Sequence, residues 1–246
     1  WIVIDTNIFY KDLRLTRSLD LLFRDIENLP YSIQIPEVIV QETINKYKEQ
    51  RQTYISRLFS SLDSLKKFTS FDINIEIGDE DLETDIDQYE IFLRERIDAF
   101  GKILPLPKTS TQELIDRALS RRKPFNSKGE GFRDVLIWET IIELVQKDDC
   151  EGIALITDNT TDFSNGDGLH KHLIDDLSDL DIDANKVILF TSLENFIISQ
   201  VLPALDELND IKDGLKAGNL ESINLENISE QFLWDLISGY EIDPNC

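Results

Sequence analysis

The chain has 246 residues, 41% of them hydrophobic, and a formal net charge of −23, so it can bury a sizeable core and resists non-specific adhesion to nucleic acid and anionic membranes. Its two Cys and two His residues have no metal-binding spacing, which argues against zinc sites and disulfide frameworks and fits a reducing compartment, so we expect a cytoplasmic protein. No apolar run approaches the roughly 20 residues needed to span a bilayer, which excludes membrane-spanning classes.

Apolar, β-prone runs alternate along the chain with segments of helical periodicity. The runs are WIVID (1–5), YSIQI (31–35), GIALIT (152–157) and KVILF (186–190). This alternation predicts an α/β fold with a central parallel sheet that is flanked by helices on both faces. The chain contains no Met and begins inside the first predicted strand, so we expect that its true amino terminus is missing or that it is an excerpt of a longer protein.

Between the second and third of these runs the pattern is helical. Pro36 precedes a periodic stretch that predicts one long helix, or a pair, through Phe68. Residues 72–98 hold 11 acidic and two basic residues, so we expect solvated surface or insertion there rather than core. Ser110 with Glu113 has the spacing of a capping box and predicts the start of a further helix.

Two more helical segments follow. The strongly apolar stretch FRDVLIWETIIELV (132–145) predicts a helix that ends before the polar KDDCEG. From Pro203 onward, periodic apolar residues predict a helical extension that packs on the domain or is held for a partner.

Carboxylates stand where the predicted fold lets them converge. Asp5 ends the first strand, Glu42 lies within about two helical turns of the second, and Asp134 opens the helix that begins at 132. Asp158 and Asp162 follow the third strand in ITDNTTDF. Each alone is explained as a cap or a solvated residue. Together they predict a cluster at one edge of the sheet, and clustered carboxylates repel unless cations such as Mg²⁺ or Mn²⁺ lie among them.

These stretches carry a family resemblance. DTN, IPEVIVQE, GFRDVLIWE and ITDNTTDF, in this order, resemble the four acidic motifs of the PIN-like nuclease superfamily, in particular its bacterial branch with a long helical insertion. The resemblance implies an α/β sandwich around a parallel sheet, with Mg²⁺ or Mn²⁺ as cofactor and cleavage of RNA, or less often DNA. It places a PIN-like domain at 1–200, with a helical and acidic insertion at about 50–125 and a helical extension at 201–246.

The same resemblance assigns residues to the site. Asp5, Glu42 and Asp134 match the first three family acids as catalytic and metal-binding residues. Asp158 and Asp162 both occupy places where family members carry the fourth acid, so both are retained. The small polar residues that would line the site with the substrate are Thr6, Asn7 and Thr157.

A basic run precedes Asp134 and reverses the charge of the chain locally. Its members are Arg117, Arg121, Arg122, Lys123, Lys128 and Arg133. One interpretation is a solvated helix end and loop that lowers repulsion near the acids. The other is an arm that contacts substrate phosphates without reading sequence, with Phe125 stacked on a base.

Three functions stay open at this point. The first is a metal-dependent endonuclease that cuts single-stranded RNA, or alternatively DNA, with nucleic acid as its partner. The second is an inactive PIN-like scaffold that binds RNA or protein partners. The third, a phosphatase of the haloacid dehalogenase type, requires a second Asp two residues after the first, and Asn7 stands there instead. A regulatory protein, a further domain and a homo-oligomer all remain compatible with the sequence.

Overall fold

In the computed structural model, residues 1–70, 73–166 and 168–216 are described. Within these residues a sheet of five parallel strands forms the centre of the fold, in the order β3-β2-β1-β4-β5. The strands are β1 (Ile2–Ile4), β2 (Ile33–Pro36), β3 (Gly101–Leu104), β4 (Ile153–Ile156) and β5 (Val187–Phe190). The parallel sheet predicted from the alternating pattern is thereby confirmed.

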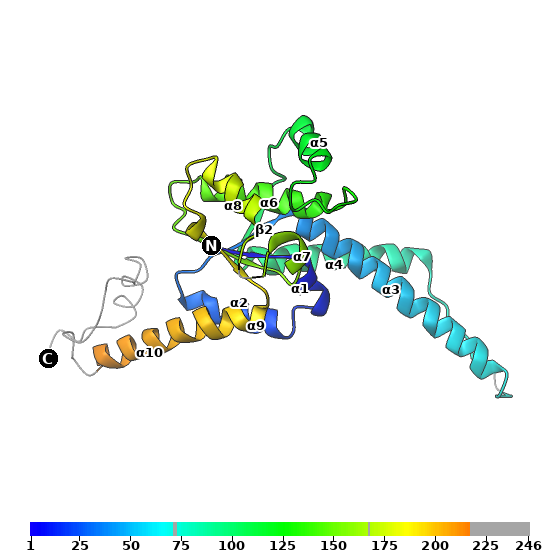
Figure 1. Cartoon of the computed structure of the whole chain (residues 1–246). Coiled ribbons are helices and arrows are strands. Elements are labelled where there is room, and N and C mark those ends of the chain that lie inside the picture. Colours follow the sequence, from blue (N-terminus) through cyan, green and yellow to red (C-terminus); the bar gives the residue numbers. More distant parts are fainter. Residues whose placement is uncertain (71–72, 167, 217–246) are drawn as a thin grey trace.

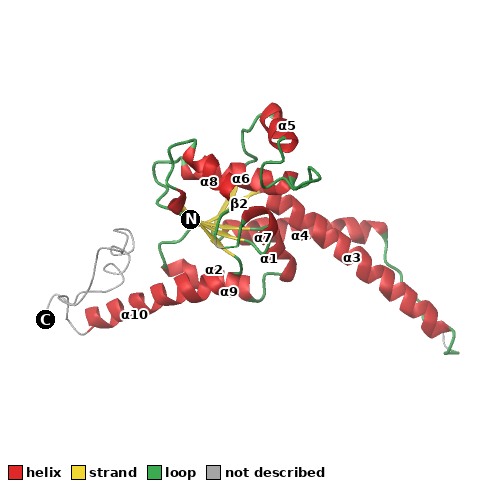
Figure 2. Ribbon diagram, viewed as in Figure 1, coloured by secondary structure: helices red, strands yellow, loops and turns green. Residues whose placement is uncertain are grey.

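The chain winds outward from the middle of this sheet in two directions. From β1 it proceeds to β2 and β3 on one side, and from β4 to β5 on the other, so the strand order reverses between β1 and β4. Helices α6 (Phe132–Val145) and α8 (Lys171–Ser178) lie over one face, and α2 (Ser18–Asp25) and α9 (Leu193–Phe196) over the other (Figures 1 and 2). In open α/β sheets, the point of reversal is where ligands bind, outside the carboxyl ends of the strands.

Further helices complete the described part of the chain. They are α1 (Thr6–Lys11), α3 (Glu37–Lys66), α4 (Asp79–Asp98), α5 (Thr111–Leu119), α7 (Thr160–Phe163) and α10 (Leu202–Lys216). Short 3-10 helices occur at Ile26–Asn28 and Ala184–Lys186, and a π-helical segment at Ile197–Val201 leads into α10. None of the helices described here is long and apolar enough to cross a membrane.

Local sequence signals predicted several of these elements correctly. The apolar stretch at 132–145 forms α6, and the long periodic stretch after Pro36 forms the single helix α3. The predicted capping box at α5 is present, because the Ser110 hydroxyl accepts from the Glu113 N–H and the Glu113 carboxylate accepts from the Ser110 N–H. Residues 217–246, most of the predicted helical extension, lie outside the described residues.

Strand β3 is absent from the predicted set. It is a short edge strand, half exposed, and its sequence GKIL carries little β pattern. Pairing with β2 nevertheless holds it in place, with Gly101 opposite Ile33. A Cβ at Gly101 would lie 2.3 Å from the carbonyl oxygen of Ile33, so this position requires glycine for the close approach of the two strands.

The expectation that residues 72–98 are solvated surface is wrong for one side of α4. Tyr89, Leu93 and Ile97 are buried in the main core, because their spacing of four residues places them on one helix face. The ring of Tyr89 stacks on that of Tyr47 with centroids 3.8 Å apart. The acidic count concealed this apolar stripe, because the acids occupy the remaining faces of the helix.

Candidate functional site

The site begins where the two central strands end. The register pairs Ile4 with Ile156, so the next residues, Asp5 and Thr157, emerge side by side at the carboxyl edge of the sheet. The Asp5 N–H donates to the Ile156 carbonyl at 2.9 Å, which continues the ladder by one step. The Thr157 hydroxyl donates to Asp5 Oδ2 at 2.5 Å. Both side chains are buried, so the strands themselves fix the position of this carboxylate.

Asp5 is held by the start of α1 as well. Its Oδ1 accepts from the Thr6 N–H at 2.6 Å, which makes it the N-cap of that helix. Its Oδ2 accepts from the Asn7 side-chain amide at 2.9 Å. The Thr6 hydroxyl donates to Glu42 Oε2 at 2.8 Å, so Glu42 on α3 faces the Asp5 end of α1.

Asp134 approaches from α6. It lies in the first turn of that helix. The residue before the helix, Gly131, has a φ of 114°. The Asn159 side-chain amide donates to Asp134 Oδ1 at 3.2 Å and to Asp162 Oδ2 at 3.1 Å. One amide group therefore bridges the carboxylate of α6 and that of α7.

Asp158 has a different environment from Asp162. Its carboxylate pairs with Lys11 at the end of α1. Its backbone N–H donates to the side-chain amide oxygen of Asn7 at 3.2 Å. Asp162 pairs with Lys123 at 2.9 Å and shares the Asn159 amide with Asp134. Both acids lie at the edge of the site, and Asp162 is the one joined to Asp134.

Burial and neighbouring negative charges disfavour the ionised forms of the two central acids. Burial raises the pKa of Asp134 from its ordinary 3.8 to about 7, and the charges of Asp5, Asp162 and Glu42 add to the rise. Burial likewise raises the pKa of Asp5 to about 6, against the hydrogen bonds from Thr157 and Thr6, which lower it. Two neighbouring carboxylates with raised pKa values indicate a place that lacks positive charge.

The outer acids are paired with the protein's own cations. Arg133 binds Glu42, Lys123 binds Asp162 and Lys11 binds Asp158. In residues 1–70, 73–166 and 168–216, no three Asp, Glu, His or Cys side chains are grouped closely enough to hold a metal ion as they stand. The donor chemistry does fit Mg²⁺ or Mn²⁺, because the groups that could bind an ion are carboxylate and hydroxyl oxygens, with no His nitrogen and no Cys sulfur among the described site residues. The side chains of Lys11 and Arg133 are 66% and 59% exposed, so both can move away from the carboxylates they neutralise.

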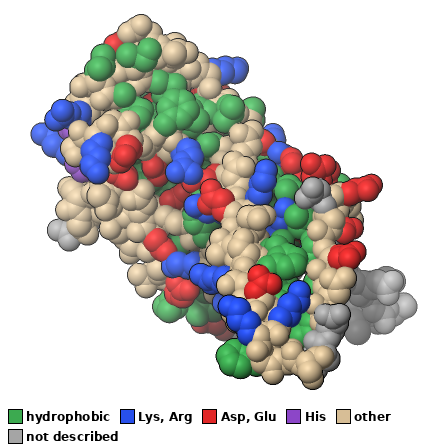
Figure 3. Space-filling model, turned by 90° about the vertical axis from the view of Figure 1, so that its right-hand side faces the viewer, with side chains coloured by type: hydrophobic (Ala, Val, Ile, Leu, Met, Phe, Trp, Pro, Cys, Tyr) green, Lys and Arg blue, Asp and Glu red, His purple; other side chains and the backbone are tan. Residues whose placement is uncertain are grey.

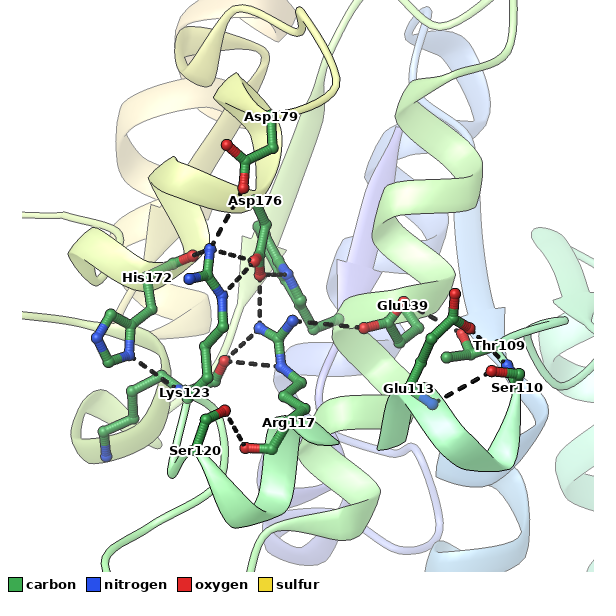
Figure 4. Close-up of polar contacts among 12 residues, drawn as sticks. Thr109, Ser110, Glu113, Arg117, Ser120, Lys123, Glu139, His172, Asp176 and Asp179 are labelled. Carbon is green, nitrogen blue, oxygen red and sulfur yellow. Dashed lines mark hydrogen bonds and ion pairs between the residues drawn. The ribbon is translucent and has the colours of Figure 1, made fainter. Parts of the chain in front are cut away.

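Two members of the predicted basic run serve the fold. Arg117 and Arg122 pair with Asp176 on α8 at 2.5 and 2.7 Å, and the Trp138 indole N–H donates to the same carboxylate at 2.8 Å. Figure 4 shows Arg117 between Asp176 and Glu139, pointing inward from α5. This cluster ties the segment before α6 to α8.

The other members of the run lie nearer the site or at the surface. Arg133 and Lys123 contact site carboxylates, whereas Arg121 and Lys128 have no acidic side-chain partner among the described residues. Phe125 is buried, with 3% of its surface exposed, so the expected stacking on a base is wrong. The basic run is therefore divided between the protein interior and the edge of the site.

Two residues of the site were not singled out from the sequence. Asn159 lies within ITDNTTDF, between the two candidate acids, and an amide in that place was a usable signal for a group that joins carboxylates. Lys11 lies one helical turn after Asn7, and that spacing alone places both on one side of α1. Its pairing with Asp158 depends on the approach of β4 and had no sequence signal.

Comparison with known proteins gives one match. Residues 2–163 match the sequence family described as PIN domain. The match contains the five candidate acids of the site, which are Asp5, Glu42, Asp134, Asp158 and Asp162. No curated protein and no solved structure matches the chain.

Proposed function

The chain belongs to the PIN domain family, and from this premise we propose that it is a metal-dependent nuclease that hydrolyses phosphodiester bonds in single-stranded RNA. PIN domains are usually nucleases, so family membership supports nuclease activity in general. The choice of RNA over DNA and of Mg²⁺ or Mn²⁺ as cofactor belongs to the proposal and rests on the motif resemblance and on the oxygen-only donor set.

The observation that carries the proposal is the convergence of acids at the point where the strand order reverses. Asp5 follows β1 and Asp134 lies in α6, two elements far apart in the sequence. Burial raises the pKa of both carboxyls, the charge of Glu42 adds to both, and the charge of Asp5 adds to that of Asp134. A purely structural role would pair each buried acid with a cation, because an unpaired buried charge is costly. Here the outer acids are paired, whereas Asp5 and Asp134 have no cationic partner in the part of the chain that the structure describes.

The chain's own residues orient the carboxylates. Thr157 and Asn7 hold Asp5 Oδ2, and the Asn159 amide fixes the distance between Asp134 and Asp162. A divalent ion bound there would lower the pKa of the attacking water and neutralise charge on the phosphodiester in the transition state. Hydrolysis adds water to phosphorus and breaks one ester P–O bond, so the products are a phosphomonoester and a hydroxyl.

The basic side chains that pair with the outer acids would also bind the substrate. Arg133 and Lys123 stand against the outer acids, and a bound phosphate would compete with those acids for both cations. Arg133 can bind a phosphate in a bidentate way, whereas Lys123 acts as a point charge. We propose Asp162 as the fourth acid of the site, because it shares an amide with Asp134, and Asp158 as the partner of Lys11.

Cleavage of a labelled single-stranded RNA, with Mg²⁺, with Mn²⁺ or with a chelator, tests the proposal. Asp5→Asn and Asp162→Asn should each lose about a hundredfold or more in rate, equivalent to about 3 kcal/mol. Asp158→Asn should lose less. Asp148→Asn, an exposed substitution after α6, is the matched control and should cut normally. Metal-independent cleavage, or full activity of Asp5→Asn, would reject the proposal.

The same assay separates the alternatives. Cleavage of single-stranded DNA in preference to RNA would favour the DNA-cutting form. Binding of RNA without any cleavage would favour an inactive scaffold. The proposal is compatible with a cytoplasmic location, a regulatory partner and a homo-oligomer. None of these three properties changes the assignment of the acids.

A further inference from the structure

Helix α3 continues beyond the α/β body as a projecting arm (Figures 1 and 2). Its inner part is covered by α4, where Asp85 accepts hydrogen bonds from Tyr47 and Arg51. From Gln52 onward nearly every side chain is exposed. We call residues 48–68 the outer arm. A long helix with so little cover needs a reason for projecting, because most helical stability comes from packing one face.

The arm is basic within an acidic chain. Residues 48–68 contain five Lys or Arg and two Asp or Glu, against a net charge of −23 for the whole chain. Lys46 and Arg51 pair with Glu49 and Asp85. Among the described residues, no acidic side chain pairs with the others, which are Lys48, Arg57, Lys66 and Lys67. In Figure 3, with the arm toward the viewer, blue side chains gather on the lower part of the face.

Aromatic side chains lie among these cations. Tyr54 is 64% exposed and Phe68 is 87% exposed, far more than their apolar rings would be in a finished core. The Arg57 guanidinium lies 5.8 Å from the centre of the Tyr54 ring. Proteins that bind single-stranded nucleic acid present cations alternating with exposed rings, because the phosphates contact the cations and the bases stack on the rings.

The outer arm also has a shallow groove. It is lined by the small hydroxyl side chains of Ser56 and Ser60 and by the cations Lys48 and Arg57, with one acid, Glu49. Short side chains allow a chain backbone to approach the helix closely, and the flanking cations are within reach of its phosphates. An acidic protein segment would meet the same cations but would not use the hydroxyls and rings together.

We propose that the outer arm binds the backbone and bases of a single-stranded nucleic acid and directs the strand toward the acids of the site. This inference rests on the proposed nuclease function. Glu42 and Lys66 lie 24 residues apart on the same helix, which is about 36 Å at the rise of an α-helix. A stacked strand covers this distance with on the order of 11 nucleotides at about 3.4 Å each. Substrates longer than this would contact both the site and the tip of the arm.

The test measures binding without cleavage. A labelled mixed-sequence single-stranded RNA of about 20 nucleotides is titrated with the full chain in a chelator, and the affinity is followed against salt. The variant Arg57→Gln, Lys66→Gln, Lys67→Gln should weaken binding about tenfold or more and reduce the salt slope by about two units, since three contacts to a single strand contribute about 0.7 each. An RNA of about six nucleotides should bind the wild-type chain much more weakly.

The matched control removes the same charge elsewhere. Lys102→Gln, Lys108→Gln, Lys171→Gln changes three exposed lysines outside the arm and should leave both affinity and slope unchanged. The variant Tyr54→Ala, Phe68→Ala should weaken binding about tenfold with an unchanged slope, because stacking releases no counterions.

Three results would overturn the inference. The first is an arm variant that binds like the control. The second is an RNA duplex of the same length that binds as tightly and loses as much in the arm variant. The third is an arm-dependent dimer of the chain with unchanged RNA binding, which would assign the arm to a second copy. Because binding is measured without divalent ion, loss of the proposed nuclease activity would leave this test intact.

Discussion

Replacing Asp134 by Asn removes a charge from the centre of the site while retaining its shape. The amide oxygen of Asn can still accept from Asn159, so the hydrogen bond at 3.2 Å survives. The pKa of Asp134 lies about three pH units above its ordinary value, and each unit corresponds to about 1.4 kcal/mol, so the ionised carboxylate destabilises the metal-free fold by up to about 4 kcal/mol. Since Asp134 is only partly buried, we expect a gain of about 2 to 4 kcal/mol.

The sign of the pH dependence follows from the raised pKa. Below about pH 4 the carboxyl is protonated in the folded chain and largely so in the unfolded chain, so the substitution should change little. Between about pH 4 and pH 7 the unfolded chain loses the proton first, and the wild-type protein loses stability relative to the variant. Above about pH 7 the gain is complete.

Urea unfolding of both proteins in a chelator, at about pH 4.5 and about pH 8, measures this difference. The control is Asp148→Asn, which makes the same chemical change at an exposed position and should give no pH-dependent gain. An Asp134→Asn protein that is no more stable than wild type at the higher pH, or that gains equally at both, would refute the raised pKa of this carboxyl and the destabilisation derived from it.

Three further outcomes are expected. Mg²⁺ or Mn²⁺ should raise the thermal midpoint of the wild-type chain more than that of Asp134→Asn, because an ion stabilises the state that binds it; equal shifts in both proteins would contradict a site at Asp134. Asp176→Ala should cost about 3 to 5 kcal/mol in urea unfolding, because the mostly buried Arg117 loses its nearer carboxylate and the Trp138 indole N–H loses its acceptor, and a cost below about 1 kcal/mol would show that this cluster is not needed. Leu93→Ala should cost about 2 to 5 kcal/mol, whereas Ile91→Ala, on the exposed side of the same helix, should stay within about 0.5 kcal/mol; equal effects would mean that α4 does not pack on the core.

The acids of the site were found from local pattern. An apolar run that ends in Asp5 predicts a strand end, and FRDVLIWE predicts the first turn of a helix, whatever the rest of the chain does. These signals are local because capping, periodicity and strand length involve residues within a few positions of one another. The parallel sheet then brings strand ends to one edge, so the approximate convergence of Asp5 and Asp134 was predictable.

Pairings between distant elements could not be predicted from local pattern. Whether Asp158 or Asp162 joins Asp134 depends on the turn that places Asn159 between them, and the partner of Arg117 depends on the approach of α8 to α5. The edge strand at Gly101 is held by β2 more than by its own sequence.

Local pattern was enough to predict the α/β class, most of the strands, the helices α3 and α6, and the order of the candidate acids. The folded arrangement was needed to show which cations neutralise those acids, which side of the acidic helix α4 is core, and that Phe125 is buried. Periodicity and capping act over a few residues, so sequence carries them directly. Burial and ion pairing depend on which surfaces meet after folding, and residues such as Arg133 and Glu42 are 91 positions apart before that happens.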